Sequence, residues 1–387
     1  MTNHKQQKAA IRARMKKTGE HYITARLHVV GMPNPKANPK VGAEMPFGRG
    51  AEHTASLLTH LLGRSGATNP ATRAPFTEPE VLGLSGGIGF MGLLFDYKGH
   101  LPIITLVMRS HPAPMANSLL DRLGVNYVTE QTGSGSKAAA SLDAHLDAGR
   151  ACLLTVGRGG LPHHVVPEIE AGEAYDILVV DRENSASVGI DDVASSATVI
   201  SRSTLDAARR ASTKTKNELI AIIDGGVTTN PTEYYQHAIE QTVANLTEPV
   251  LGNAFDVNFG IRGMEKLAAS LRDTRTKKGW PHVLVAPDAF AFGMVRLHQC
   301  LTNDYGGPSA LRPTYATFLR GAATVLPNGA GCLRQPTCST RPARRGSTPP
   351  NWPSRPPDHR CRTLRSPPHA RHSISVGTPS WPAATPR

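Results

Sequence analysis

The hydrophobic pattern of the chain changes its period near residue 229. Before that point, short apolar and β-branched runs such as 101–108 and 150–157 predict strands. Between them lie segments with leucines three and four residues apart, the first over 52–63, which predict helices packed through one face. After residue 229 the helical period continues through four segments, at 232–246, 259–273, 286–301 and 311–326.

Mixed strands and helices followed by helices alone indicate an α+β domain and then an all-helical domain. In the second helical segment, the predicted buried face carries Ile261, Met264, Leu267 and Leu271. We therefore expect four regions: a basic helical arm and linker at 1–42, an α+β domain at 43–228, a helical domain at 229–327, and a disordered tail at 328–387.

The net charge of +13 is concentrated at the two ends of the chain. Residues 1–40 hold nine Lys or Arg and one acidic residue, whereas residues 41–327 hold 24 basic and 28 acidic residues. The basic arm at 1–40 is either a solubilising helical extension or a binding segment for nucleic acid or an acidic carrier protein, and such binding would fade with salt. No stretch of 18 apolar residues predicts a membrane span. Five scattered cysteines are typical of a protein from the reducing cytoplasm.

The last sixty residues have the composition of a segment that does not fold. They hold twelve prolines, ten arginines, no lysine and one acidic residue, and their apolar residues are isolated. Arginine without lysine, together with Pro, Cys, His and Trp, is typical of GC-rich coding read out of frame. We therefore interpret 328–387 either as such a readout, with the native frame ending near 326–329, or as a natural basic tail.

Single motifs do not identify a catalytic site. The glycine cluster GLSGGIGF at 83–90 lacks the spacing of a dinucleotide fingerprint and the Lys of a P-loop, so it predicts tight turns rather than nucleotide binding. Cys152 lies inside an apolar strand and is expected to be an inert core residue. His163 and His164 are interpreted as partly exposed loop residues, because no metal-ligand partner follows at short spacing. No cofactor or metal is expected.

The order of several weak motifs resembles a known family. The runs PFGRG, HTASLLTHLLG, EPEVLGLSGGIGFM, LDAGRACLLTVGRGGLPHH, YDILVVDREN and VGIDD are similar, in this order, to the N-terminal domain of butirosin biosynthesis protein H. The later run FGIRGMEKLAASLRDTRTKKGWP is similar to the helical domain that accompanies it. The resemblance covers about 43–327 and implies a papain-like α+β fold.

The resemblance also implies acyl transfer from a carrier-protein thioester to an aminoglycoside amine through a cysteine thiolate. Matching the leucines of the first helix places Glu52 and His53 at the family's His-Cys pair, so His53 occupies the cysteine position. Ala174 and Tyr175 stand where a later family histidine is expected, and Asp192, with Asp191 beside it, stands at the acid position. The resemblance therefore implies a site of Glu52, His53 and Asp192 without the sulfur nucleophile.

Two interpretations of function follow from this departure. The chain is either related to the acyltransferases without their cysteine chemistry, or it is a non-catalytic protein of secondary metabolism that binds a small molecule, a peptide or a carrier protein. An acyl carrier protein and a small-molecule amine are the partners that the resemblance implies, in preference to nucleic acid. Under a shifted alignment, His60 or His164 would serve a mechanism without cysteine. His60 is otherwise expected to be a partly exposed helix residue, and an acyl-enzyme would need Thr54 or Ser56.

Overall fold

The computed structural model describes residues 50–327 except 165, 167–170, 194–195 and 303–306. All of them lie within the first of the two units into which the chain divides, Met1–Gln335. The predicted arm at 1–42 and the predicted tail at 328–387 lie outside the described residues. In the described part of the chain, no helix is long and apolar enough to cross a bilayer.

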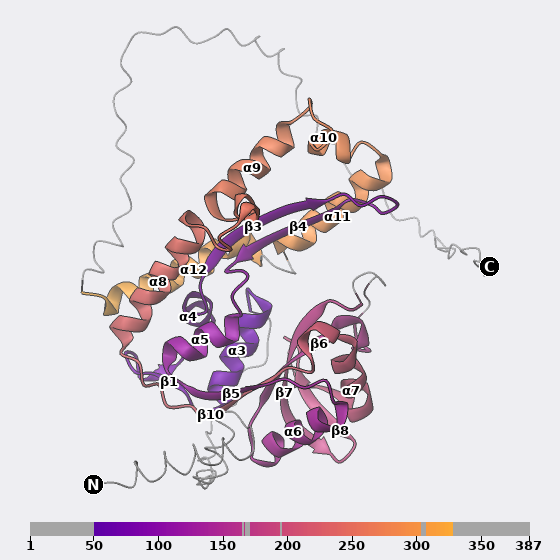
Figure 1. The fold of residues 1–387 in the computed structure, drawn as a ribbon. Coiled ribbons are helices and arrows are strands. Elements are labelled where there is room, and N and C mark those ends of the chain that lie inside the picture. Colours follow the sequence, from indigo (N-terminus) through magenta and orange to yellow (C-terminus); the bar gives the residue numbers. More distant parts are fainter. Residues whose placement is uncertain (1–49, 165, 167–170, 194–195, 303–306, 328–387) are drawn as a thin grey trace, which may run out of the picture. The chain divides into compact units, whose positions relative to one another are not determined.

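The described part of the chain is a mixed α/β structure with antiparallel sheets (Figure 1). Its helices of at least one α-turn and its strands are, in chain order, α3 His53–Arg64, β1 Thr68–Asn69, β2 Ala74–Pro75, α4 Glu78–Leu84, β3 Ile88–Phe95, β4 Ile103–Arg109, α5 Met115–Leu123, β5 Asn126–Glu130, α6 Gly135–Asp147, β6 Cys152–Gly157, β7 Ala174–Asn184, β8 Ser187–Asp191, β9 Thr198–Ser201, α7 Arg202–Ala211, β10 Leu219–Asp224, α8 Pro231–Thr247, α9 Gly260–Arg272, α10 Trp280–Val283, α11 Pro287–Thr302 and α12 Arg312–Val325.

The largest sheet has six strands in the order β5-β10-β6-β7-β8-β9, and each neighbouring pair is antiparallel. Its strands alternate between two cores because successive side chains point to opposite faces. In β6, Leu153 joins the core that contains Leu57 of α3, whereas Cys152 and Leu154 join the core that contains Leu205 of α7. An antiparallel sheet covered by helices agrees with the predicted α+β class and excludes a doubly wound parallel sheet.

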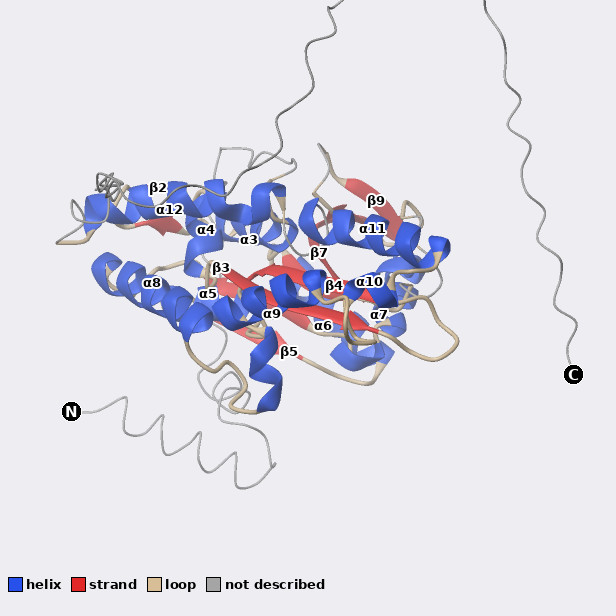
Figure 2. Cartoon of the chain, turned by 90° about the horizontal axis from the view of Figure 1, so that it is seen from above, coloured by secondary structure: helices blue, strands red, loops and turns tan. Residues whose placement is uncertain are grey.

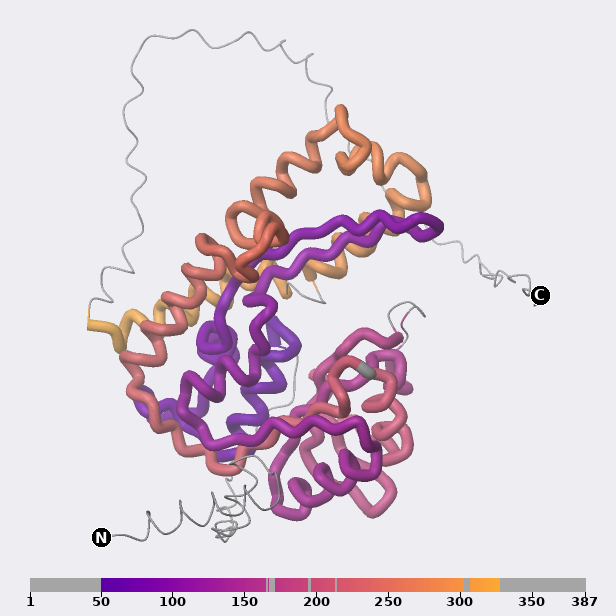
Figure 3. The backbone as a smooth tube through the Cα atoms, viewed as in Figure 1, coloured from indigo at the N-terminus to yellow at the C-terminus, as the bar shows by residue number. Residues whose placement is uncertain are grey.

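A second, two-stranded sheet is the long hairpin of β3 and β4 (Figure 3). The hairpin runs between helices from the C-terminal part of the chain, with α9 against β3 and α11 against β4. Ile104 and Leu106 of β4 share a core with Cys300 of α11. The helices after residue 229 therefore bury the apolar face of a hairpin formed far earlier in the sequence.

Helices α8 and α12 also pack on the first part of the chain (Figure 2). Tyr235 and Phe318 belong to the same core as Leu57. Gly83 of α4 lies directly under the Phe318 ring, where a Cβ would overlap the ring carbons. The predicted boundary at 228/229 falls in the segment between β10 and α8, and the division into two domains at this point stays a prediction.

Several local predictions are refined by the structure. The glycine-rich segment begins as helix α4, whose N-terminus is capped by a capping box of Thr77 and Glu80. The chain then turns into β3 through Gly86 and Gly87, which both have positive φ. The helical period of α9 is confirmed, but Ile261 and Leu271 of its predicted buried face are exposed. The buried positions of α9 are glycines, because the helix approaches β3 and the segment before it closely.

Candidate functional site

The start of α3 is held in place by Glu52. Its Oε2 accepts a hydrogen bond from the Ala55 N–H at 2.6 Å, which caps the helix, and its Oε1 lies 3.3 Å from Nε of Arg109. The Glu52 N–H donates to Oε1 of Glu78 at 2.8 Å. Both carboxylate oxygens of Glu52 are thus engaged at the helix start and at the end of β4.

His53, the first residue of α3, points toward the start of β7. Its Nε2 lies 2.7 Å from the carbonyl oxygen of Asp176, and since a carbonyl only accepts, Nε2 carries the proton. Its ring packs against the ring of Tyr175, with centroids 4.5 Å apart. In the neutral imidazole, the lone pair is consequently on Nδ1.

Tyr175 connects His53 to Asp192. Its hydroxyl donates to Asp192 Oδ1 at 2.7 Å, and the Arg158 guanidinium carbon lies 5.1 Å from its ring centroid. Burial, and next the adjacent Asp192 carboxylate, raise the pKa of Tyr175 above its ordinary range. Tyr175 is therefore a neutral hydrogen-bond donor.

Asp192 is the point at which the polar groups of this region meet. Its Oδ2 lies 2.6 Å from Nε2 of His163 and 2.5 Å from Nε2 of His164, and only 2% of its side chain is exposed. Burial by itself would raise the pKa of this carboxyl, but the hydrogen bonds from its three partners hold the pKa below the ordinary value. Asp192 is thus a buried carboxylate with three donors around it.

Of the three residues predicted for the site, the structure brings two to a common neighbour. His53 and Asp192 both contact Tyr175, one through its ring and the other through its hydroxyl. Glu52 instead contacts Arg109 and the first turn of α3. The glycine turn after α4 contacts Ser110, next to Arg109. It therefore lies near Glu52 rather than near Tyr175 and Asp192.

Two predictions about histidines are corrected. His60 is not a partly exposed helix residue, because it is 4% exposed and its Nδ1 lies 2.6 Å from Oδ2 of buried Asp191. His163 and His164 are partly exposed, as predicted, but they do have a ligand-type partner in Asp192. Asp192 lies 28 residues after His164, so short sequence spacing could not reveal it. The adjacent pair LPHH and the later GIDD are the signals that, taken together, could have found it.

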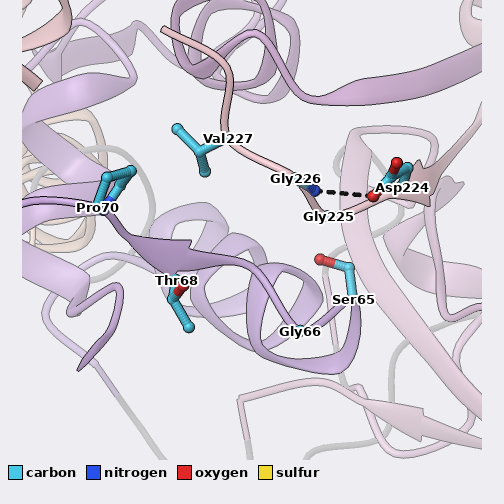
Figure 4. A pocket seen from close by; sticks show the side chains of 8 residues that line it. All are labelled: Ser65, Gly66, Thr68, Pro70, Asp224, Gly225, Gly226 and Val227. Carbon is cyan, nitrogen blue, oxygen red and sulfur yellow. Dashed lines mark hydrogen bonds between the residues drawn. The ribbon is translucent and has the colours of Figure 1, made fainter. Parts of the chain in front are cut away.

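One hollow of the described surface lies at the other end of α3 (Figure 4). It encloses about 300 Å³ and is lined by Ser65, Gly66, Thr68, Pro70, Asp224, Gly225, Gly226 and Val227. The Asp224 carboxylate accepts from the Gly226 N–H at 3.0 Å, so the hollow's acidic group is already used by its own turn. α3 has 12 residues, which puts this hollow roughly 16 Å along the helix from His53.

Cys152 is expected to be chemically inert, as predicted from its strand. It is fully buried, and burial raises the pKa of its thiol to about 12. We expect iodoacetamide at pH 8 to leave Cys152 unlabelled in the folded protein and to label it after denaturation, as measured by peptide mass spectrometry. Cys152→Ser should leave any activity unchanged. Labelling of native Cys152 within minutes would contradict this expectation.

The fold and the site together define an α+β protein in which the start of α3 faces Tyr175 of β7 and its partner Asp192, directly after β8. Residues 56–193 match the family model described as Butirosin biosynthesis protein H, N-terminal. The resemblance inferred from the motif order is therefore confirmed over this range. The match includes Tyr175 and Asp192 and begins three residues after His53. No curated protein matches the chain in sequence.

Proposed function

We propose that this chain is a butirosin-H-like acyltransferase that moves an acyl group from a thioester directly to an amine, without a cysteine acyl-enzyme. The observation that carries the proposal is the series His53–Tyr175–Asp192. These residues occupy the positions at which the resemblance implies a cysteine, a histidine and an acid. Their contact in this order is what a papain-like arrangement predicts, with different residues at the first two positions.

The proposed chemistry uses His53 as a general base. Because Nε2 donates to Asp176, Nδ1 of the neutral ring is free of a proton and can accept one from the attacking amine. The amine nitrogen then forms a bond to the thioester carbonyl carbon, and the carbon–sulfur bond breaks. The proton passes from His53 Nδ1 to the departing thiolate. Negative charge on the carbonyl oxygen during this step would be stabilised at the N-terminal end of α3 by backbone N–H groups other than that of Ala55, which already donates to Glu52.

Binding without turnover is the second candidate function. It is favoured by the partners of Asp192, which are Tyr175, His163 and His164 rather than the base His53. In the cysteine enzymes of this arrangement, the acid orients the base. Here the carboxylate orients a tyrosine that stays neutral, so His53 could serve only as a hydrogen-bonding group for a small molecule or a carrier-bound acyl chain.

The test is a thioester assay with an S-acetyl-N-acetylcysteamine donor and an aminoglycoside as the amine. We expect amine-dependent release of thiol that persists after iodoacetamide treatment, and no acetylated protein in intact-mass spectra. Activity abolished by iodoacetamide together with an acetylated cysteine would contradict direct transfer. Binding of donor or amine in calorimetry without thiol release would support the binding function instead.

A further inference from the structure

Three metal-ligand atoms converge at the end of β8, and neither the family match nor the proposed function uses them as a metal site. They are Nε2 of His163, Nε2 of His164 and Oδ2 of Asp192, all within 4.8 Å of one another. The two histidines follow the turn after β6, and Asp192 follows β8 directly. Two segments about thirty residues apart therefore present one carboxylate and two imidazoles to the same point.

We propose that His163, His164 and Asp192 form a zinc site with an open coordination position. Imidazole nitrogen and carboxylate oxygen are ligands that Zn²⁺ prefers, and three protein ligands leave the fourth tetrahedral position to water or to a ligand. The proposal does not rest on the proposed function, with which it shares Tyr175 and Asp192.

The surroundings of Asp192 have the features of a metal ligand's environment. Its Oδ1, the oxygen outside the converging set, accepts the Tyr175 hydroxyl at 2.7 Å, so the carboxylate is oriented by a neighbour as metal-binding carboxylates usually are. The Asp192 side chain is only 2% exposed, whereas the side chains of His163 and His164 are 32% and 17% exposed. An ion can therefore reach the site from the histidine side.

The geometry needs only a small adjustment to accept the ion. The two Nε2–Oδ2 distances are 2.6 and 2.5 Å. Zinc bonds of about 2.0–2.1 Å at tetrahedral angles separate ligand atoms by roughly 3.3 Å. Rotation of the partly exposed imidazoles supplies the difference. On binding, each Nε2 gives its lone pair to the ion and the ring proton moves to Nδ1, so the hydrogen bonds to Asp192 are replaced by metal bonds.

In the experiment, the full chain is stripped of metal with EDTA and dialysed. Zinc is then titrated back in competition with a chromophoric chelator, which measures the zinc that the protein binds. The chain has 16 His and five Cys in all, so the readout is the loss of one tight equivalent relative to a control. We expect His164→Ala and Asp192→Asn each to weaken that equivalent at least 100-fold. His100→Ala, which removes an exposed histidine from the β3–β4 turn, should leave it unchanged. Circular dichroism of each variant verifies folding.

Tyr175→Phe keeps the ring and removes the hydrogen bond to Asp192, and it should weaken zinc binding about 10- to 100-fold. Binding in His164→Ala and Asp192→Asn equal to that in His100→Ala would overturn the proposal and leave a hydrogen-bonded cluster. His53→Ala should retain zinc. A parent protein that binds this zinc equivalent but shows no amine-dependent thiol release would contradict only the proposed function. Thiol release without a zinc equivalent that depends on His164 and Asp192 would contradict only the zinc proposal.

Discussion

His53→Gln is expected to lower amine-dependent thiol release by about 10²- to 10⁴-fold, the usual contribution of a positioned general base. Glutamine keeps a side chain that can hydrogen-bond to the Asp176 carbonyl, where Nε2 of His53 lies 2.7 Å from the oxygen. It has no lone-pair nitrogen that takes up a proton near neutral pH. The loss should therefore appear in the rate of transfer, while the affinity for the thioester changes little.

The matched control is His237→Gln on the exposed face of α8. It removes a histidine of the same chemistry outside the His53–Tyr175–Asp192 series and should leave thiol release unchanged. Thermal unfolding of both variants should coincide with that of the parent protein within the error of the measurement. Undiminished thiol release in a folded His53→Gln variant would remove His53 from the reaction.

His60→Ala is expected to destabilise the protein by about 3 kcal/mol, as measured by chemical denaturation. His60 and Asp191 form a buried pair with 5% and 6% of their side chains exposed. Removal of the imidazole leaves the Asp191 carboxylate with the Val193 N–H at 2.8 Å as its remaining described partner. An incompletely paired buried charge costs several kcal/mol, more than an exposed ion pair contributes.

A double-mutant cycle separates this pair from simple loss of packing. Asp191→Ala in the His60→Ala background removes the unpaired carboxylate. The double variant should therefore lose less free energy of unfolding than the sum of the losses in the two single variants. His237→Ala, at an exposed position, should change the free energy of unfolding by less than about 0.5 kcal/mol. A loss below about 1 kcal/mol in His60→Ala would mean that the pair does not anchor α3 to the end of β8.

The strands and helices of the described part could largely be predicted from local pattern. The apolar runs at β4, β6 and β7 and the leucine spacing of α3 are properties of a few neighbouring residues, and each element formed where its pattern indicated. Elements whose pattern is weak were missed. Helix α4 has only seven residues, too few to show a helical period, and it runs into a glycine-rich turn. Its start is set by the capping box at Thr77.

The site could be predicted only in part. The resemblance placed Glu52, His53 and Asp192 in one site, and the structure brings only His53 and Asp192 to Tyr175. The roles of Glu52, His60 and His164 depend on partners 57, 131 and 28 residues away, namely Arg109, Asp191 and Asp192. No local pattern contains such pairings, because they depend on how strands and helices meet after folding.

By itself, the amino-acid sequence determined the periodicity of the strands and helices, the inert core position of Cys152, and the absence of sulfur at the start of α3. Only the tertiary structure decided that the helices after residue 229 cover the β3–β4 hairpin and that Asp192 lies between two histidines and a tyrosine. Periodicity is set by backbone geometry over a few residues, whereas a polar cluster requires distant segments to bury the same point together.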